Sequence, residues 1–406
     1  MDRTKKRILF AGAYGIENAG DDLPLIVLSQ RIKKILPSIE FRALSRHPNV
    51  WEENKYGVKM IKNLEYESRE DAKGKWFKGL NFGDDKEDIA RVTKEIKNCN
   101  LIVIGAGNFL IDITIDIFRG PVPLIALYVF LAKMFHKPVM LFGFSAGPLK
   151  TQIGINLSRW IIESADIVTV RDMASQQFVE NLLYLPKKIH QLPDPTLGVE
   201  SLSQICIEKN IIKEKINTKR KIIAIGLRDL SSLFSHKVTQ EFLKQLAKYI
   251  NLMKRQYSFL FIPQSTYKED DDRLIAKKIV SLLDNDVEYT IIENRYDPME
   301  LIGFYSICEL TIAVRLHSAV FSIIARTPVI AINYLPKVEG FMRSMGVERN
   351  LLKVNRCKMK DLLRITEQIM ANKKSIVKDI SKRLRRKKQL VNRYAEFAIS
   401  LLEREG

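Results

Sequence analysis

Residues 310–325 read Leu-Thr-Ile-Ala-Val-Arg-Leu-His-Ser-Ala-Val-Phe-Ser-Ile-Ile-Ala. The apolar run 310–314 predicts a buried strand, and 318–325 predicts the helix that follows it. Arg315 and His317 therefore stand at the carboxyl edge of a sheet beside unpaired helix N–H groups, which predicts an anion site where proton transfer is also possible. The alternative is that Arg315 pairs with a structural carboxylate such as Glu309 and that His317 caps the helix.

The same alternation of strand and helix extends through two successive parts of the chain. Strands are predicted in the first part at 8–13, 40–44, 101–105, 138–142 and 166–170, and in the second at 221–227, 258–263, 288–293, 310–314 and 329–333. Near-continuous apolar strands of this kind are typical of parallel sheets that are covered on both faces. We therefore expect an α/β fold of two doubly wound, Rossmann-like domains facing a central cleft and closed by a C-terminal helix.

The length of the chain also favours two domains, because 406 residues exceed the size at which a single core usually stops growing. The alternation is interrupted between Pro195 and Arg220, where the charged stretch 209–221 lies. We expect an N-terminal domain over 1–200, a C-terminal domain over 215–360 and basic helices over 361–406. The polar segment 65–88 is typical of a lid or a disordered loop.

Charge and cysteine content restrict the partners and the location. The chain carries 66 Lys and Arg against 47 Asp and Glu, and the net charge of +19 favours phosphorylated metabolites, nucleic acid or an anionic membrane surface. Its four cysteines are far apart and suggest neither a zinc site nor a disulfide framework, so we expect no metal. The N-terminus leads straight into a predicted strand without an apolar signal region, which predicts a cytoplasmic location.

Three glycine-containing segments follow strands of the first part, at 11–22, 105–112 and 143–148. Glycines permit positive φ and let a ligand approach the backbone, so the three segments together predict a binding site at one sheet edge. In the first segment the adjacent carboxylates of Asp21 and Asp22 would repel a pyrophosphate, and a neutral, hydroxyl-bearing ligand suits it better. The alternative is a tight loop in which Asp21 is the N-cap. The predicted binding residues of this part are Gly15, Asn18, Asp21, Gly107, Asn108, Asp112, Ser145 and Arg171.

Arg171 precedes Asp172 at another strand end, where a structural Arg–Asp pair is the alternative to ligand binding. In the second part Arg228, Gln264 and the pair Arg315 and His317 end three strands, and Lys337 and Glu339 follow a fourth. Two arginines and a histidine at strand ends of one sheet suit a small dianionic or trianionic ligand.

These motifs, in this order, resemble the polysaccharide pyruvyl transferase family from about Ile8 to about Gly346. They are Gly15-x-x-Asn18-Ala19-Gly20-Asp21-Asp22, Gly105-x-Gly107-Asn108, Ser145-Ala146-Gly147-Pro148, Arg171-Asp172, Asp194-Pro195, Arg228, Arg315-Leu316-His317 and Tyr334-x-x-Lys337. The resemblance implies a fold similar to GT-B glycosyltransferases and phosphoenolpyruvate as the donor of a ketal-linked pyruvate. The sequence departs from the family's usual motifs in the three glycine segments. It has Asp21-Asp22 where Asp-Glu is usual, Gly105-Ala-Gly-Asn108 where Gly-Gly-Gly-Ser is usual, and Ser145-Ala-Gly-Pro148 where Ser-Ile-Gly-Pro is usual. These departures leave the acceptor less defined than the donor.

The implied acceptor is a sugar of a cell-surface polysaccharide or of its lipid-linked precursor, and no cofactor is expected beyond phosphoenolpyruvate as co-substrate. Arg228 and Arg315 would hold the anionic groups of the donor, and His317 would act as general acid or as proton donor to the phosphate. Asp21 or Asp112 could deprotonate an acceptor hydroxyl. The alternative for both is a helix cap or a hydrogen-bonded loop carboxylate.

The C-terminal stretch is strongly basic, with a cluster from Lys382 to Lys388 and the apolar residues Ile376, Ile380, Leu384 and Leu390 between the charges. This pattern suits a helix that contacts an anionic membrane, which would place the protein at the inner face of the membrane. The alternative is a solvated closing helix that packs its apolar stripe across both domains. No nucleic-acid-binding motif accompanies the charge.

Two other functions remain open from the sequence. One is a GT-B glycosyltransferase that uses a nucleotide sugar, in which Glu339 could hold the ribose. The other is a non-catalytic relative that binds a polyanion or a membrane. The presence of Arg228, Arg315 and His317 together favours the transferase over the non-catalytic relative.

Overall fold

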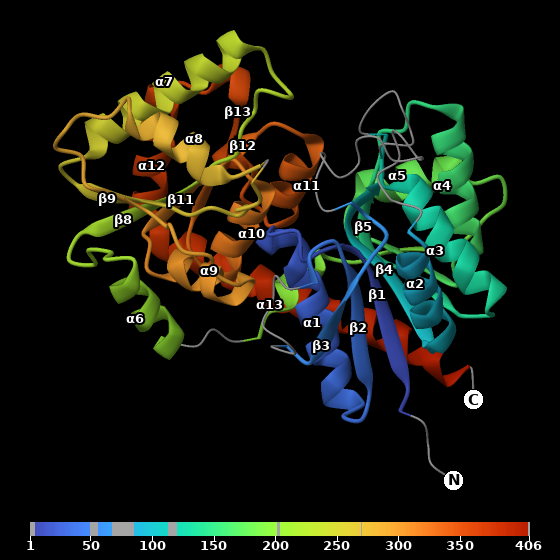
Figure 1. Ribbon diagram of the computed structural model, residues 1–406. Coiled ribbons are helices and arrows are strands. Elements are labelled where there is room, and N and C mark those ends of the chain that lie inside the picture. The colour runs from blue at the N-terminus through green and yellow to red at the C-terminus, as the bar shows by residue number, and fades with distance from the viewer. Residues whose placement is uncertain are drawn as a thin grey trace. The chain divides into compact units, whose positions relative to one another are not determined.

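The computed structural model describes residues 5–48, 56–66, 85–112, 120–200, 204–268 and 270–404. Two compact units divide the chain (Figure 1). Unit 1 comprises Met1–Ile16, Asp21–Gly198 and Lys388–Gly406, and unit 2 comprises Glu17–Gly20 and Val199–Lys387. Most of the polar segment 65–88, for which a lid or a disordered loop was predicted, lies outside the described residues.

Unit 1 contains a seven-stranded parallel sheet with the strand order β3-β2-β1-β4-β5-β6-β7. Its central strands are buried almost throughout because helices cover both faces. The strands are β1 (Arg7–Tyr14), β2 (Glu40–Ser45), β3 (Val58–Lys62), β4 (Leu101–Leu110), β5 (Val139–Ala146), β6 (Ile167–Val170) and β7 (Ile189–Gln191).

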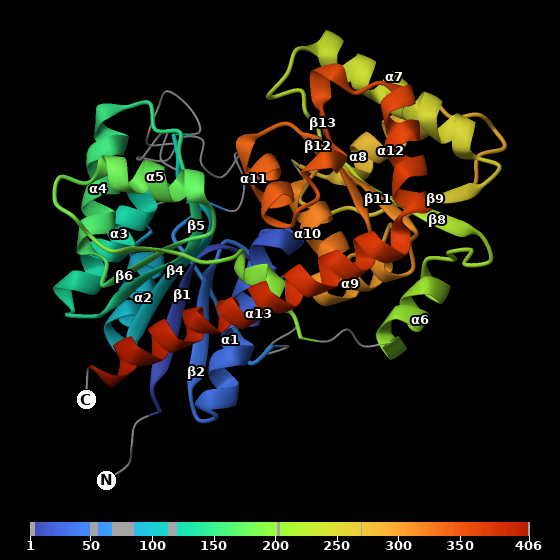
Figure 2. The ribbon, with the colours of Figure 1, turned by 180° about the vertical axis from the view of Figure 1, so that it is seen from behind.

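Four helices of unit 1 pack side by side as one layer: α2 (Lys86–Asn98), α3 (Val122–Met134), α4 (Gln152–Ser164) and α5 (Met173–Leu182). Alternate strand residues such as Leu9, Ile102 and Leu141 form a hydrophobic core with this layer. The opposite face is covered by α1 (Ala19–Ile35) and by the C-terminal part of α13 (Lys373–Glu403), as Figure 2 shows. There the Phe142 ring packs edge-on against Tyr394, with ring centroids 4.9 Å apart.

Unit 2 contains a six-stranded parallel sheet with the order β10-β9-β8-β11-β12-β13. Helices α6, α9 and α10 form one row and α8, α7 and α12 another, with the sheet between the rows (Figure 1). The strands are β8 (Lys221–Gly226), β9 (Tyr257–Phe261), β10 (Tyr289–Ile291), β11 (Leu310–Ala313), β12 (Val329–Asn333) and β13 (Leu351–Lys353). The helices are α6 (Gln204–Lys213), α7 (His236–Met253), α8 (Asp272–Val280), α9 (Pro298–Ser306), α10 (Leu316–Ile324), α11 (Pro336–Ser344) and α12 (Met359–Ala371).

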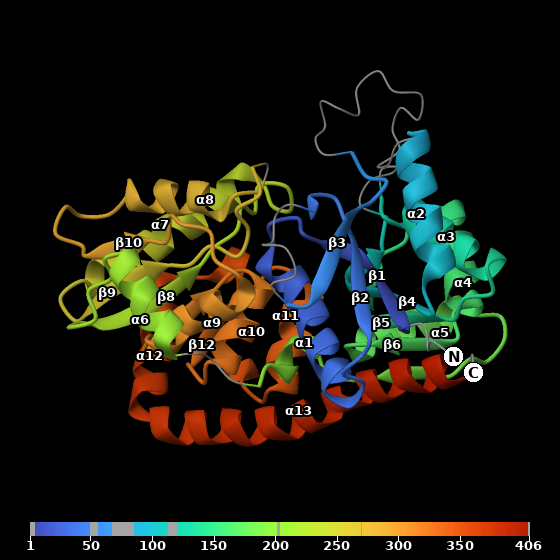
Figure 3. The ribbon, with the colours of Figure 1, turned by 60° about the horizontal axis from the view of Figure 1, so that its bottom comes forward.

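Helix α13 is continuous over its 31 residues, and its residues up to Lys387 belong to unit 2 whereas those from Lys388 belong to unit 1 (Figure 3). Of the apolar residues predicted along it, Ile376 and Ile380 are buried, Leu384 is half-buried and Leu390 is 47% exposed. Val391 and Tyr394 are buried as well. Within the described residues, no helix is long and apolar enough to cross a membrane.

The predicted α/β class with two parallel, Rossmann-like sheets and a C-terminal helix is confirmed, and all ten predicted strands form. Three edge strands were not predicted: β3, β7 and β13. They have three to five residues and carry polar side chains such as Lys59, His190 and Lys353. Edge strands are only partly buried, so they need not show the continuous apolar run on which the prediction depended.

Candidate functional site

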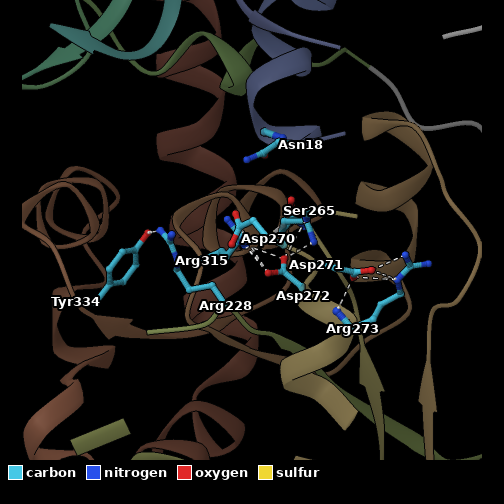
Figure 4. A network of polar contacts seen from close by, with 11 residues as sticks. Asn18, Arg228, Ser265, Asp270, Asp271, Asp272, Arg273, Arg315 and Tyr334 are labelled. Atoms are coloured by element: carbon cyan, nitrogen blue, oxygen red, sulfur yellow. Dashed lines mark hydrogen bonds and ion pairs between the residues drawn. The ribbon is translucent and has the colours of Figure 1, made fainter. Parts of the chain in front are cut away.

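The C-terminal ends of three adjacent strands in unit 2 bring together the basic residues predicted to bind an anion. In the sheet, β11 lies between β8 and β12. Arg228 follows β8, Arg315 follows β11 and Tyr334 follows β12, each one or two residues beyond the strand end. Because parallel strands end at the same edge, these three side chains meet there (Figure 4).

Arg315 is a buried cation held by two carboxylates. Its Nε lies 2.8 and 2.7 Å from the two carboxylate oxygens of Asp272, and its Nη2 donates to Asp270 Oδ2 at 2.7 Å (Figure 4). Burial lowers the pKa of Arg315, but the two carboxylates outweigh burial and raise it, so the guanidinium stays charged. The other terminal nitrogen, Nη1, makes no hydrogen bond within the described residues and remains available for a ligand.

The alternative that Arg315 pairs with a structural carboxylate is confirmed by Asp272 and Asp270. The suggested partner Glu309 is wrong, because Glu309 forms its ion pair with Lys373 instead. Helix α10 begins at Leu316, so Arg315 occupies the N-cap position and His317 lies in the first turn. The predicted cap by His317 is therefore also wrong, and the helix has no side-chain cap hydrogen bond. Both side chains are left to other contacts at the sheet edge.

Arg228 differs from Arg315 because no carboxylate within the described residues forms an ion pair with it. Its Nη1 lies 3.4 Å from the Tyr334 hydroxyl, and its guanidinium carbon lies 5.3 Å from the centre of the Tyr334 ring. Its Nε is buried without a hydrogen bond in the described part of the chain. A half-buried guanidinium that the protein does not neutralise is well suited to an anionic ligand.

Tyr334 is a member of this cluster that the sequence prediction did not include among the binding residues. It is 8% exposed, and burial alone would raise the pKa of its phenol. The positive charges of Lys337, Arg228 and Arg315 outweigh burial and hold the pKa of Tyr334 below its ordinary value. The available sequence signal was the Tyr334-x-x-Lys337 spacing after the predicted strand 329–333.

His317 lies against the segment 17–20, which belongs to unit 2 although it includes the first two residues of α1. A β carbon added to Gly20 would collide with the His317 ring at Nδ1, so the glycine permits this close packing. The segment is held by a β-bridge between Asn18 and Ser265 and by the Ala19 N–H, which donates to the Gln264 carbonyl at 3.0 Å (Figure 4). Asn18, which was predicted with the binding residues of the first part, therefore lies in unit 2.

The remaining predicted residues of unit 2 have mainly internal partners. The side-chain nitrogen of Gln264 donates to the Tyr305 hydroxyl at 2.9 Å. The two carboxylate oxygens of Glu339 accept separate hydrogen bonds from Asn333 and Arg343. Lys337 is half-buried in the first turn of α11 and contributes positive charge to Tyr334.

In unit 1 the polar residues at the corresponding sheet edge bind one another. Arg171 donates to Ser145 Oγ at 2.8 Å and to Asp194 at 3.1 Å, and the Ser145 hydroxyl donates to Asp172. Asp172 also caps α5. This arrangement is the structural Arg–Asp pair that was the alternative to ligand binding, with Asp194 as the partner of Arg171.

Asp112 is likewise a structural carboxylate of unit 1. One of its oxygens accepts hydrogen bonds from the backbone N–H groups of Lys150 and Thr151 at 2.6 and 2.7 Å and from the Thr151 hydroxyl. It is 2% exposed. These contacts match the alternative of a hydrogen-bonded loop carboxylate rather than a free base.

The predicted glycine loops are in large part strand. β4 continues through Gly107 and Asn108 to Leu110, and β5 continues through Ser145 to Ala146. The strand β4 can continue through a glycine because its pairing with β5 is irregular there: Gly107 has a φ of 114°, and the register shifts after Asn108. The Asn108 amide donates to the Gly147 carbonyl at 3.3 Å.

In the first glycine segment the predicted N-cap role of Asp21 is wrong, because α1 begins at Ala19 and Asp21 lies in its first turn. The neighbouring Asp22 accepts a hydrogen bond from the Gly15 N–H at 2.8 Å, which ties the segment to the helix. Asp21 is half-buried, and a β carbon built on Gly107 would lie 3.7 Å from its Oδ1. Asp21 and Gly107 are thus neighbours within unit 1. Over the ranges that the structure describes, no three His, Cys, Asp or Glu side chains could hold a metal ion.

Comparison with known proteins gives both a family and a fold. Residues 18–336 match the family model described as polysaccharide pyruvyl transferase. Over 270 residues the chain is 26% identical to the amylovoran biosynthesis protein AmsJ of Erwinia amylovora, covering 64% of this chain and 63% of that protein. The chain therefore spans less than two thirds of that relative.

Solved structures with the same GT-B fold share little sequence with this chain. Anabaena HepE, solved with UDP and glucose, superposes with a TM-score of 0.57 at 13% identity and covers 98% of this chain and 99% of its own. A glycosyltransferase from Rickettsia africae gives a TM-score of 0.56 at 14% identity, covering 99% and 97% of the two chains. At such low identity these similarities establish the fold alone.

Proposed function

This chain belongs to the polysaccharide pyruvyl transferase family, and on that premise we propose that it transfers pyruvate from phosphoenolpyruvate to two hydroxyls of one sugar. The sugar would belong to a cell-surface polysaccharide or to its precursor, and the products would be a ketal and phosphate. The observation that carries this proposal is Arg228, a half-buried guanidinium that no described carboxylate neutralises, beside Arg315 at one sheet edge.

The donor fits this edge by charge. Phosphoenolpyruvate carries a phosphate and a carboxylate, and each requires cationic hydrogen-bond donors. Arg228 would bind one of these groups with its free nitrogens, and Arg315 would contribute Nη1 while Asp272 and Asp270 hold its other nitrogens in place. Lys337 adds a third positive charge, so the edge offers three cations to a trianionic donor.

His317 supports the proton transfer that the reaction requires. C3 of phosphoenolpyruvate must gain a proton before C2 can accept a hydroxyl, and an imidazolium can donate that proton near neutral pH. The resulting neutral imidazole can take the proton of the first attacking hydroxyl, so His317 ends the addition in its starting state. Phosphate then leaves, and the second hydroxyl of the sugar closes the ketal. No cofactor is needed for these steps, because neither oxidation nor reduction occurs.

The test is to incubate purified protein with phosphoenolpyruvate and a panel of sugars and to measure released phosphate and pyruvylated sugar together. We expect both products in equal amounts with at least one acceptor. Pyruvylated sugar from the wild-type protein, and none from His317→Gln, would support the proposal. Hydrolysis of phosphoenolpyruvate without ketal formation with any acceptor would overturn it.

A glycosyltransferase that uses a nucleotide sugar is less well supported. In such an enzyme Glu339 would have to hold a ribose, but its two oxygens already accept hydrogen bonds from Asn333 and Arg343. A non-catalytic polyanion-binding relative would not need a histidine in the first turn of α10, two residues after Arg315. If UDP-sugars were consumed and phosphoenolpyruvate were not, the glycosyltransferase would replace our proposal.

We further propose that the protein works in the cytoplasm and that α13 brings it to the inner face of the membrane, where a lipid-linked acceptor would lie. Most apolar side chains of α13, including Ile376, Ile380 and Val391, are buried and Leu390 is exposed, so this contact would be mainly electrostatic rather than an insertion. The exposed side of the helix within unit 2 is basic and includes Lys374, Lys378, Lys382, Arg385 and Arg386. The burial of most of these apolar side chains also agrees with a closing helix, and the two roles are compatible.

Replacing Lys374, Lys378 and Lys382 by Gln should weaken binding to anionic vesicles. Each basic residue near such a surface contributes about 1 kcal/mol, so three should change the partition coefficient by about 150-fold. The matched control replaces Lys237, Lys244 and Lys248, which are exposed on α7, and it should retain most of the binding. Equal losses in both variants would indicate an effect of net charge alone, and the membrane role of α13 would be rejected.

A further inference from the structure

Tyr334 has an unusual place among the buried tyrosines of this protein. It stands one residue beyond β12, next to the strands whose ends carry Arg228 and Arg315. Its hydroxyl oxygen accepts a hydrogen bond from Arg228 Nη1 at 3.4 Å (Figure 4). The hydroxyl hydrogen has no acceptor among the described residues, so Tyr334 can still donate one hydrogen bond.

Three cations from different elements act on Tyr334, and the Asp229 carboxylate beside Arg228 acts on that arginine. Arg228 follows β8, Arg315 follows β11, and Lys337 lies in the first turn of α11. The carboxylates of Asp270 and Asp272 are engaged by Arg315. The phenol therefore faces a net positive environment, which stabilises its phenolate form.

Other buried tyrosines show the opposite behaviour. Burial raises the pKa of Tyr14, Tyr128 and Tyr394 well above the ordinary value, and it also raises the pKa of Tyr249. Tyr334 is 8% exposed, yet its pKa is below the ordinary value because of Lys337, Arg228 and Arg315. Because its phenolate is stabilised relative to that of an ordinary tyrosine, this buried phenol gives up its proton more readily.

We propose that Tyr334 is a catalytic proton-transfer residue that acts on the leaving phosphate, an inference that rests on the proposed function. After the first hydroxyl has added to C2, the bond between C2 and the oxygen that bridges to phosphorus breaks. That bridging oxygen keeps the electron pair of the broken bond and takes the phenolic proton of Tyr334. Hydrogen phosphate leaves, and C2 becomes an oxocarbenium ion. Arg228, Lys337 and Arg315 stabilise the phenolate that remains.

The second half of the cycle restores the phenol. The second hydroxyl of the sugar attacks C2, and its proton passes to the Tyr334 phenolate as the ketal closes. Phosphoenolpyruvate and two hydroxyls are thereby converted into a ketal and hydrogen phosphate without a net gain or loss of protons. His317 and Tyr334 then have separate tasks: His317 serves the addition to C2 and Tyr334 serves the elimination and closure.

A structural role for Tyr334 makes different predictions. If the phenol merely positions Arg228, its loss should weaken phosphoenolpyruvate binding and raise KM, while kcat at saturating donor stays near normal. Proton transfer instead requires a fall in kcat. The two roles can therefore be separated by steady-state kinetics.

The first test compares Tyr334→Phe with Tyr249→Phe, a matched control in α7 whose buried hydroxyl shares a hydrogen bond with the Thr366 hydroxyl of α12. We expect Tyr334→Phe to lower kcat by about 10²–10⁴-fold, the usual contribution of a general acid or base, with donor affinity changed by less than about tenfold. Tyr249→Phe should keep kcat within about twofold of the wild type. A normal kcat in Tyr334→Phe, with or without a raised KM, would overturn the inference.

The second test replaces Tyr334 by a fluorinated tyrosine, which lowers the pKa of the phenol with little change in shape. We expect the limb of the pH–rate profile that belongs to this residue to move to lower pH, which a positioning role would not produce. An unmoved profile would overturn the inference. A wild-type protein that neither binds phosphoenolpyruvate nor releases phosphate would overturn the proposed function itself. Normal wild-type turnover with unaffected Tyr334→Phe would reject only the role of Tyr334.

Discussion

The carboxyl edges of the two sheets carry similar residues, but the residues are used differently. In unit 1 Arg171 follows β6 and pairs with Asp194, and the two side chains are each 6% exposed. In unit 2 Arg228 follows β8 and donates a hydrogen bond to the Tyr334 hydroxyl, and no described carboxylate forms an ion pair with it. Arg315 resembles Arg171, since carboxylates hold both of these arginines and each has one terminal nitrogen that makes no hydrogen bond within the described residues.

This difference shows that an arginine after a strand is not by itself a binding residue. What matters is whether the fold supplies its counter-charge. A buried arginine with a complete set of partners stabilises the domain, whereas one without a carboxylate has a desolvated charge that a ligand can neutralise. The comparison therefore predicts loss of stability from changes in unit 1 and loss of ligand binding or turnover from changes in unit 2.

The largest effect should come from the histidine at the unit 2 edge. His317→Gln should lower turnover by about 10²–10⁴-fold, because general acid–base groups typically contribute that much, while phosphoenolpyruvate affinity changes little. Gly20→Ala should act in the same direction, since the added methyl group would displace the His317 ring. Rates at saturating donor, combined with calorimetric affinities, would check this. Near-normal turnover in His317→Gln would remove the residue from the mechanism.

The next effect tests the structural edge of unit 1. Arg171→Met should lower the free energy of unfolding by about 3–5 kcal/mol, because it removes the cation that pairs with the buried Asp194 carboxylate. Denaturant unfolding would measure the loss. The protein that remains folded should bind phosphoenolpyruvate as the wild type does. Weak donor binding by stable Arg171→Met protein would show that unit 1 also binds the donor and would break the comparison.

A smaller change is expected in the matched variant of unit 2. Arg228→Met should cost little stability, since no described ion pair is lost, but it should weaken phosphoenolpyruvate binding by about 1.5–3 kcal/mol. This corresponds to an affinity loss of roughly tenfold to 150-fold. Calorimetric titration would measure it. Unchanged affinity together with a large loss of stability would show that Arg228, like Arg171, stabilises the fold rather than binding the donor.

The smallest effect concerns Glu214, a carboxylate of unit 2 whose hydrogen-bond partners are supplied by the protein itself, as they are for Asp194 in unit 1. Glu214 accepts hydrogen bonds from the N–H groups of Glu293 and Asn294, from the Asn294 amide and from the Tyr296 hydroxyl. Burial raises its pKa, but these bonds outweigh burial and hold the pKa below its ordinary value. The stabilisation is therefore present above the unfolded pKa of about 4.3 and is lost as the pH falls through the folded pKa.

Glu214→Gln should accordingly reduce the stability of unit 2 by about 1 kcal/mol at neutral pH, and the difference from the wild type should shrink in acid. Hydrogen exchange of the amides of Glu293 and Asn294 across this pH range would report the loss locally. A difference that grew in acid would contradict the assigned direction of the pKa. Donor binding should be unaffected.

The sequence was sufficient for the nine central strands, because buried parallel strands need continuous apolar runs, and it also predicted the edge strand β10. It was not sufficient for the partners of charged residues, which come from distant parts of the chain. Asp272 and Asp270 reach Arg315 from the start of α8, and Asp194 reaches Arg171 from beyond β7. Nothing local distinguishes these arginines from Arg228.

The glycine segments and the segment 17–20 show the same limitation. Gly107 and Gly143 indicated loops because glycine disfavours strands, but irregular pairing carries β4 and β5 through them. Asn18 was grouped with the first sheet by sequence order, although its bridge to Ser265 places it in unit 2. Tyr334 belongs to the motif Tyr334-x-x-Lys337, but the sequence did not predict it as a binding residue, because its importance depends on three cations from other elements.

Ligand-dependent thermal stability tests most directly whether the unit 2 edge is a phosphoenolpyruvate site. A ligand that binds only the folded protein stabilises it, by about 2.7 kcal/mol at a concentration 100 times its Kd. We expect phosphoenolpyruvate to raise the melting temperature of the wild type and of stable Arg171→Met protein but to have much less effect on Arg228→Met, while UDP- and GDP-sugars have little effect on any of them. Stabilisation by a nucleotide sugar alone, or an undiminished phosphoenolpyruvate effect in Arg228→Met, would contradict the account.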